Sequence, residues 1–230
     1  MPFREDFLIS AFSVDPVIFG FDKGTLKILL IKRNEDPFQS KWALPGELVF
    51  PNEDLDDAPL RVLKEATGLT DVFLEQVQAF GKVDRHPLGR VLTIAYYSLV
   101  NIHKVKPPKA AAFAEKVEWI DVDKIRELAF DHAEIVKACL KQLRLNLRIH
   151  PIGFELLPEK FTLTELQSLY EAVLQKHLDK RNFRKKILSM GLLKDIKEYQ
   201  KGVAHRPAKL YTFDAEKYEL SVKEGFSFEM

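Results

Sequence analysis

The chain changes character at one break, where prolines and a glycine interrupt a long amphipathic segment. The break reads His150-Pro151-Ile152-Gly153, with Pro158 close behind. Proline has no amide hydrogen to donate and its ring clashes with the preceding turn, so a helix that reaches this point must end there. Strand-like runs dominate before the break and short helical patterns follow it. The sequence therefore predicts two domains, 1–150 and 151–230, each long enough to bury a core of its own.

The first part mixes the two kinds of secondary structure. Runs rich in β-branched and aromatic residues predict strands, whereas apolar residues at helical spacing predict amphipathic helices. The expected strands are 14–21, 26–31, 91–100 and 116–120, and the expected helices are 56–66 and 131–148. Strands mixed with two helices indicate an α/β or an α+β sandwich.

The second part has the element order of a winged helix-turn-helix. A helix at 162–175 begins with the Thr162 and Glu165 pair of a capping box, and a second helix at 179–190 begins on a capping aspartate. Two strand-like runs, 192–199 and 208–213, follow as a hairpin. The residues expected to pack the two helices together are Leu163, Leu166, Leu169, Tyr170, Val173, Phe183, Ile187 and Leu188.

Charge is divided unevenly along the chain. The whole chain carries only +1, but the segment 176–209 holds eleven Lys or Arg against three acidic residues, a net +8, which leaves −7 for the rest. Such a division suits a phosphate-binding segment joined to a mildly acidic domain. The alternative is a solvated basic face that binds nothing.

The basic helix has the side chains that DNA recognition needs, because phosphates attract cations and base edges accept hydrogen bonds. The residues expected to face DNA from this helix are Lys180, Arg181, Asn182, Arg184 and Lys185, and those from the wing are Lys201, His205, Arg206 and Lys209. The competing interpretation is a small helical interaction domain kept soluble by its charges. The combination of caps, packing face and wing favours double-stranded DNA.

Other classes of protein are disfavoured by composition. The single cysteine, Cys139, excludes an internal disulfide and a cysteine-based zinc site. No apolar run approaches the ~18 residues of a membrane-spanning helix, and the charged start is unlike a signal peptide. We therefore expect a cytoplasmic protein with no membrane partner.

The segment that starts at Trp42 resembles the Nudix box. When the two are aligned on Gly68, Glu53 falls on the first glutamate of the box, Arg61 on its arginine and Glu65 on the first of its paired glutamates. The resemblance implies the Nudix α/β/α sandwich. Hydrolysis of a pyrophosphate needs hard cations, and these need clustered oxygen ligands.

Three departures from the box argue against such chemistry. Glu47 replaces the opening glycine, and Val62 and Ala66 replace two helix glutamates. We expect a non-hydrolytic domain with no catalytic residue, no resident metal and no cofactor, in which Glu65 pairs with Arg61 instead. An active Nudix pyrophosphatase with an accessory interaction domain is the competing class.

A Nudix-like domain joined to a winged helix resembles the Nudix-related transcriptional regulators of the NrtR type. The segments that carry the resemblance are SVDPVIFGFD, LLIKR, KWALPGE, FGKVDRHPLGRV, LDKRNFRKKIL and HRPAKLY. The damaged box makes the chain most similar to the Bacteroidetes AraR-type branch, which senses L-arabinose. The resemblance implies a repressor that binds a palindromic operator as a homodimer and senses a small metabolite.

Two effectors remain open. A diphosphate such as ADP-ribose would need cations, for which Arg33, Arg85, His86 and Arg90 are candidates. A pentose would need neutral and acidic hydrogen-bonding groups with an aromatic face, and the candidates are Trp42, Glu47, Asp84, Tyr96 and Trp119. Trp42 and Tyr96 are also expected as core aromatics, and Arg85 as a bridge within a loop. Because Glu47 would repel a diphosphate, the sequence favours a pentose such as L-arabinose.

Overall fold

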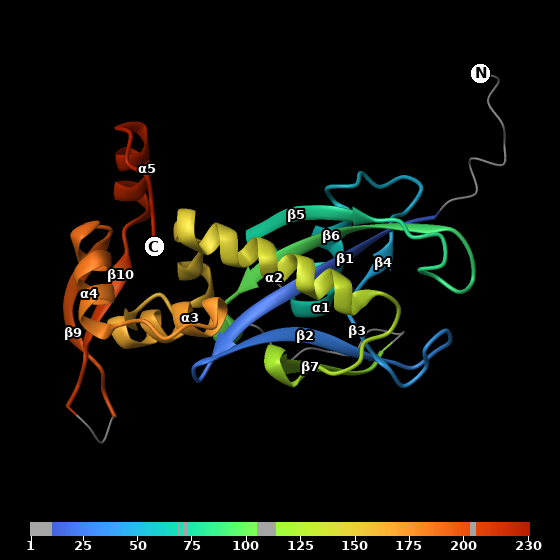
Figure 1. Ribbon diagram of the computed structural model, residues 1–230, viewed down its shortest axis with the longest axis horizontal. Helices are drawn as coiled ribbons and strands as arrows, with labels where there is room; N and C mark the ends of the chain where they lie inside the picture. Colours follow the sequence, from blue (N-terminus) through green and yellow to red (C-terminus); the bar gives the residue numbers. More distant parts are fainter. Residues whose placement is uncertain (1–10, 69, 71–72, 105–113, 203–205) are drawn as a thin grey trace. The chain divides into compact units, whose positions relative to one another are not determined.

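The computed structural model describes residues 11–68, 70, 73–104, 114–202 and 206–230, and the chain divides into two compact units (Figure 1). The first unit holds the described residues up to 20 and those of 27–142, and the second holds 21–26 and 143–230. The division falls inside a helix, before the boundary at residue 150 that the sequence suggests. None of the described helices is long and apolar enough to cross a membrane.

The first unit is built on a mixed seven-stranded sheet. The strands are β1 (Ala11–Asp22), β2 (Thr25–Arg33), β3 (Trp42–Ala43), β4 (Glu47–Leu48), β5 (Phe73–Phe80), β6 (Val91–Val100) and β7 (Ala114–Asp121). The order is β3-β2-β1-β6-β5, with β4 paired to β1 and β7 paired to β2. Strands β1 and β6 run parallel, whereas the pairs β1–β4, β2–β3, β2–β7 and β5–β6 are antiparallel.

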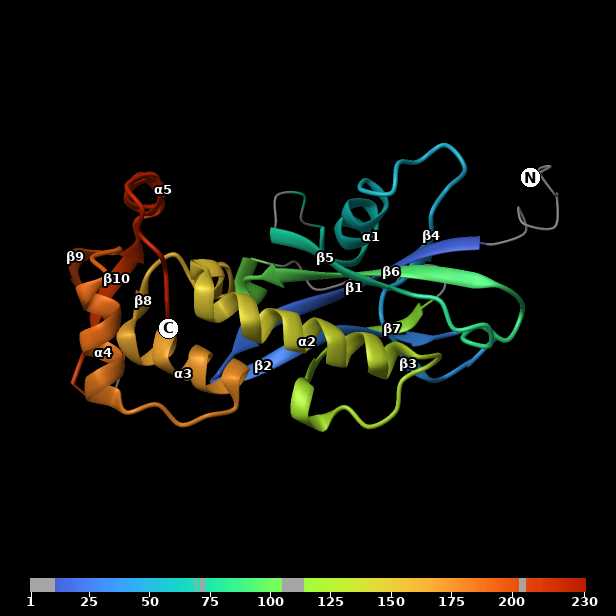
Figure 2. The ribbon, with the colours of Figure 1, turned by 45° about the horizontal axis from the view of Figure 1, so that its top comes forward.

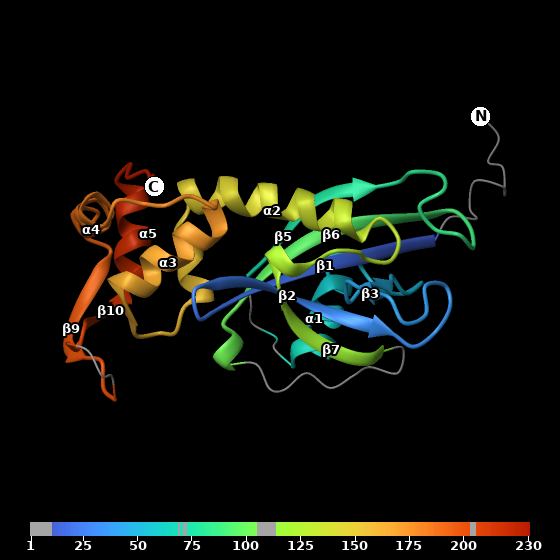
Figure 3. The same cartoon turned by 60° about the horizontal axis from the view of Figure 1, so that its bottom comes forward.

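Helices cover both faces of this sheet. Figures 2 and 3 show α1 (Ala58–Thr67) on one face and the first half of α2 (His132–Ile149) on the other. Helix α1 ends at Gly68, whose φ of +77° is a left-handed conformation that glycine adopts without strain. The described residues of this unit also form two short 3-10 helices, η2 (Ile102–Lys104) and η3 (Val122–Lys124). The predicted α/β/α sandwich is confirmed.

The second unit is a winged helix. Its elements are η4 (Pro151–Leu156), β8 (Phe161–Thr162), α3 (Leu163–Leu174), α4 (Lys180–Ser189), β9 (Leu193–Tyr199), β10 (Lys209–Phe213) and α5 (Ala215–Lys223). The strands form an antiparallel sheet in the order β8-β10-β9. Both predicted caps are present: the Thr162 hydroxyl accepts the amide hydrogen of Glu165 at 3.1 Å, and the Asp179 carboxylate accepts that of Asn182 at 2.8 Å.

The structure corrects several expectations. Leu188 was expected in the core between α3 and α4, but 45% of it is exposed. Successive helix residues are about 100° apart, so Leu188 points away from the face that Phe183 and Ile187 bury. Strand β5 and helix α5 were not expected. Strand β5 is rich in glutamine and glutamate, which are weak strand formers, so its pairing with β6 is what defines it.

Candidate functional site

Helix α1 carries the segment that resembles the Nudix box, and its two altered positions are packed against the sheet. Val62 is only 3% exposed and lies in an apolar cluster with Val14 and Tyr96. Ala66 packs against a second cluster that includes Leu63. Apolar side chains therefore complete the core at the two positions where the box has glutamates.

The remaining carboxylates of the box surround an arginine. Glu53 accepts two hydrogen bonds from Arg61, at 2.7 and 3.0 Å, and these bonds hold the pKa of Glu53 below its usual value. Glu47 and Glu65 lie 3.9 and 4.0 Å from the same guanidinium, so the expected Arg61–Glu65 pair is the weaker contact. The ring of Phe50 lies under this guanidinium, 4.0 Å from its carbon.

In this arrangement the guanidinium of Arg61 occupies the space between the carboxylate oxygens of Glu47, Glu53 and Glu65. Arginine stays charged at any ordinary pH, so it competes permanently with a metal ion for the same oxygens. Within the described ranges, no group of three or more His, Cys, Asp or Glu residues is placed to hold a metal.

A cavity of about 570 Å³ opens beside β1 and the loop after β5, and we call it the arginine pocket. It brings together five of the candidate effector residues, namely Arg33, Glu47, Arg85, His86 and Arg90. Its remaining lining is Ala11, Ser13, Asp15, Glu35, Leu44, Gly46, Leu48, Leu88, Gly89, Val91, Phe130 and His132.

The floor of the arginine pocket is a buried ionic network centred on Arg85, whose side chain is 3% exposed. Its guanidinium donates to both oxygens of Asp131, at 2.7 and 2.9 Å, and to Asp15 at 3.4 Å. Asp15 also fits because residue 46 is a glycine: a Cβ there would lie 1.8 Å from the Asp15 carboxylate. The charge of Arg85 is thus paired with two carboxylates of the same domain, as expected if Arg85 bridges a loop.

His132 completes the network as a neutral imidazole. Its Nδ1 accepts the backbone amide hydrogen of Leu44 at 2.9 Å, which leaves its proton on Nε2, 3.7 Å from Asp15. Burial, the largest influence, lowers the pKa of His132 below its usual value. No motif in the sequence indicated this histidine.

Two arginines of the pocket keep their charge available. The Arg33 Nε donates to the carbonyl of Pro37 at 2.7 Å, and the Arg90 Nη1 donates to that of Gly81 at 2.7 Å. Backbone carbonyls orient a guanidinium without neutralising it. In the described part of the chain, Arg90 has no acidic partner and Arg33 has only Glu35, at 3.9 Å.

An aromatic surface lies beside these cations. The rings of His86 and Phe130 are stacked, with centroids 5.1 Å apart and planes at 12°. Burial, the largest influence, lowers the pKa of His86 below its usual value, which favours the neutral form of the ring. The guanidinium of Arg33 lies over the other aromatic ring, 5.2 Å from the centroid of Phe130. The pocket therefore offers cations and a flat apolar face together.

The other four candidate effector residues lie elsewhere. Trp119 packs against the apolar cluster that includes Leu63. Tyr96 is buried in the cluster with Val62, which matches the core interpretation, and its hydroxyl lies 3.4 Å from Gln76. Trp42 lines a different cavity, and Asp84 is exposed and lines neither cavity. Residues that are close in the sequence need not line the same pocket, because alternate residues of a strand point to opposite faces of the sheet.

Helix α4 presents most of its predicted DNA-binding residues to solvent. Lys180, Arg181, Asn182 and Lys185 are exposed. Arg184 is only half-buried rather than free: its Nη2 donates to the hydroxyl of Thr164 at 3.2 Å, and its buried Nε has no hydrogen-bond partner among the described residues. The basic face of α4 is thus built from exposed cations with one arginine anchored to α3.

The wing, formed by β9, β10 and their connection, is less uniform. Lys201 and Arg206 are exposed. Lys209 forms an ion pair with Asp195 and lies 5.9 Å from the ring centroid of Tyr211, so its charge is partly used within the hairpin. His205, also predicted to bind DNA, lies outside the described residues.

Two family models match successive parts of the chain. The NUDIX domain model matches residues 11–139, and the NrtR DNA-binding winged helix domain model matches residues 153–213. An ADPR responsive transcriptional repressor, NtrR, of Acinetobacter baylyi is 34% identical over 95% of this chain and 88% of its own length. An ADP-ribose pyrophosphatase of Methanocaldococcus jannaschii is 37% identical over 48% of this chain and 64% of its own.

Solved structures resemble most of the chain as well. Shewanella oneidensis NrtR in complex with a 27-mer DNA is 29% identical, with a TM-score of 0.77, over 88% of this chain and 93% of that one. The NUDIX domain of the same protein in complex with ADP ribose is 28% identical, with a TM-score of 0.55, over 61% of this chain and 93% of that one. The chain therefore belongs to the NrtR family of transcriptional regulators, in which a Nudix domain is followed by a DNA-binding winged helix.

Proposed function

We propose that this regulator is a repressor that binds operator DNA through α4 and senses ADP-ribose in the arginine pocket. The observation that carries the effector is the pair of arginines, Arg33 and Arg90, which backbone carbonyls orient beside the stacked rings of His86 and Phe130. A diphosphate favours cations, and an adenine ring favours a flat aromatic face. The names of the Acinetobacter repressor and of the Shewanella complex support the same choice.

A pentose such as L-arabinose, as in the AraR-type branch, is the second candidate. Glu47 lines the pocket, and its pKa is raised chiefly by burial, so this carboxyl is a potential partner for sugar hydroxyls. A neutral sugar, however, would bring no negative charge to Arg90 or to the distantly paired Arg33, and it would fill little of a cavity of about 570 Å³. ADP-ribose accounts for more of the pocket.

We propose further that the degenerate Nudix box does not hydrolyse its ligand, so that the chain is not an enzyme. The support is chemical: Val62 and Ala66 contribute no oxygen, and Glu53 is committed to Arg61. An active pyrophosphatase needs clustered carboxylates to hold hard cations. Phosphate release from ADP-ribose with Mg²⁺ or Mn²⁺ at ~1 s⁻¹ or more would establish the competing class.

For DNA, we propose that Arg181 and its exposed neighbours on α4 read a palindromic operator. Two copies of the chain in a homodimer would present two such helices to half-sites one helical turn apart, about 34–36 Å. Lys201 and Arg206 of the wing would contact the flanking backbone. Because the proposed partner is operator DNA, we assign the protein to the cytoplasm.

The proposal is tested by fluorescence anisotropy with labelled promoter fragments, with and without candidate effectors. We expect ADP-ribose to release the DNA and L-arabinose to leave it bound. Arg90→Gln should reduce the response to ADP-ribose while DNA affinity stays unchanged, and Arg148→Gln, an exposed arginine that lines neither cavity, serves as the matched control. Release by L-arabinose alone would favour the second candidate.

A further inference from the structure

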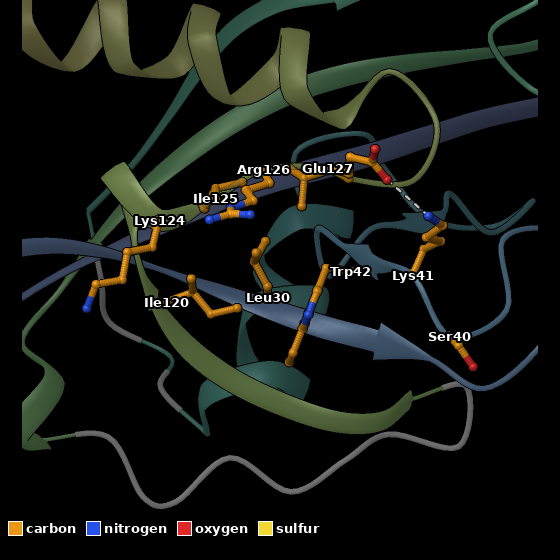
Figure 4. Close-up of a pocket in the computed structure, with 10 residues that line it drawn as sticks. Leu30, Ser40, Lys41, Trp42, Ile120, Lys124, Ile125, Arg126 and Glu127 are labelled. Carbon is orange, nitrogen blue, oxygen red and sulfur yellow. Dashed lines mark hydrogen bonds and ion pairs between the residues drawn. The ribbon is translucent and has the colours of Figure 1, made fainter.

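A second cavity of about 420 Å³ lies in the first unit, separate from the arginine pocket and unused by the proposed function. Its lining is apolar on one side, where Leu30, Trp42 and Ile120 meet (Figure 4). Leu30 is 1% exposed, whereas Trp42 is only half-buried and keeps part of its indole open to the cavity. A cavity of this size, with an aromatic wall, is typical of a site for a small molecule.

The cations at the rim differ in how much of their charge is available. Lys41 is paired with Glu127 at 3.0 Å, and Lys124 is paired with Asp121 at 2.6 Å. Arg126 has neither an ion pair nor a hydrogen bond with any described residue. Arg126 and Lys124 both line the cavity. In Figure 4 the amino group of Lys124 points away from Leu30 and Trp42. One cation is therefore available next to the apolar wall.

We propose that this cavity is a second ligand site, for a small aromatic or apolar molecule with a single negative charge. The apolar body would cover Trp42 and Ile120, which are only half-buried, and a carboxylate or sulfonate would accept the forked hydrogen bonds of Arg126. A diphosphate would bring more charge than one available cation matches. The class of ligand is thus different from that of the arginine pocket.

The site is connected to the arginine pocket by two segments that hydrogen bonds hold together. Residues 41–44 and 124–132 line the second cavity at one end and the arginine pocket at the other. Between the ends, the Ala129 amide donates to the Trp42 carbonyl at 2.7 Å, and the Leu44 amide donates to His132 at 2.9 Å. A ligand that shifts one segment at the second cavity also changes the wall of the arginine pocket.

The probe for the site is 8-anilino-1-naphthalenesulfonate, a fluorescent aromatic monoanion. The chain has two tryptophans, so Trp119→Phe leaves Trp42 as the single tryptophan. In this background we expect saturable quenching of Trp42 by the probe. Arg126→Gln should raise the dissociation constant of the probe about tenfold, as expected for the loss of a charge-assisted hydrogen bond. Arg148→Gln should leave this constant unchanged.

The uncharged analogue N-phenyl-1-naphthylamine separates charge recognition from apolar binding. It should quench Trp42 equally in wild type and in Arg126→Gln. Absence of saturable quenching by the sulfonate, equal affinities for it in Arg126→Gln and Arg148→Gln, or an equal loss for both probes would each overturn the proposal.

The coupling between the two sites rests on the proposed function, because ADP-ribose is its readout. We expect a saturating concentration of the sulfonate to change the dissociation constant of ADP-ribose at least twofold in wild type and not in Arg126→Gln, since two linked sites affect each other reciprocally. An unchanged constant in wild type would refute the coupling. Failure of ADP-ribose to bind at all would refute the proposed function, while the Trp42 quenching still decides the second site.

Discussion

Arg85 supplies the most quantitative test of how the arginine pocket is built. Its guanidinium faces Asp131 at 2.7 Å and Asp15 at 3.4 Å, with all three side chains at most 10% exposed. Arg85→Met keeps much of the side-chain volume but leaves two buried carboxylates without their cation. Breaking a buried ion pair in this way costs about 3–5 kcal/mol, so we expect the first unit to lose that much free energy of unfolding.

The assay follows from the positions of the tryptophans. Residues 42 and 119, the only tryptophans of the chain, both belong to the first unit, so urea unfolding followed by tryptophan fluorescence reports on that unit alone. Asp131→Asn is the partner variant. If uncompensated charge is the cause, the double variant Arg85→Met/Asp131→Asn recovers about 1–3 kcal/mol of the loss. A cost below about 1 kcal/mol, as for an exposed pair, or a strictly additive double variant, would refute the reasoning.

Three further predictions concern DNA binding, hydrolysis and pH. Arg181→Ala should weaken operator binding by about 1–3 kcal/mol, measured by anisotropy against Arg148→Gln, and leave the affinity for ADP-ribose unchanged; equal operator affinities would remove α4 as the reading helix. Val62→Glu restores one glutamate of the Nudix box. It should lower the free energy of unfolding by about 3 kcal/mol or more without producing hydrolysis. Phosphate release from ADP-ribose by this variant would contradict the expected lack of hydrolysis. Because burial raises the pKa of Glu47 in the folded protein, the folded state holds the extra proton and is favoured as pH falls. The stability gain of Glu47→Gln over wild type, from urea titrations, should therefore be largest at neutral pH and shrink towards pH 4.5, the usual pKa of a glutamate; a gain that grows on acidification would oppose this.

The sequence predicted the elements that depend on local patterns. Examples are the cap at Thr162 and Glu165, the break at Pro151 and the amphipathic stripe of α2. Each of these depends on residues that are close together in the sequence, and the structure has each of them. Strand β5 was missed because its residues favour a strand only when β6 lies beside them.

The candidate site could be predicted only in part. The segment around Arg85, His86 and Arg90 was found because it is contiguous and rich in cations. The sequence could not show which arginine charge is available to a ligand. Arg85 is paired with Asp131, which lies forty-six residues further along the chain. Phe130 and His132 likewise gave no local signal.

The sequence by itself therefore determined features that depend on composition and on local patterns. These are a Nudix-like domain in which two glutamates of the box are replaced, a basic winged helix, and the types of side chain that each domain could offer a ligand. Tertiary structure decided which side chains share a pocket and which charges remain available. The reason is physical, because the energy of a charge depends on its nearest partners and on its burial. In this chain those partners come from strands and loops far apart in sequence, and only folding brings them together.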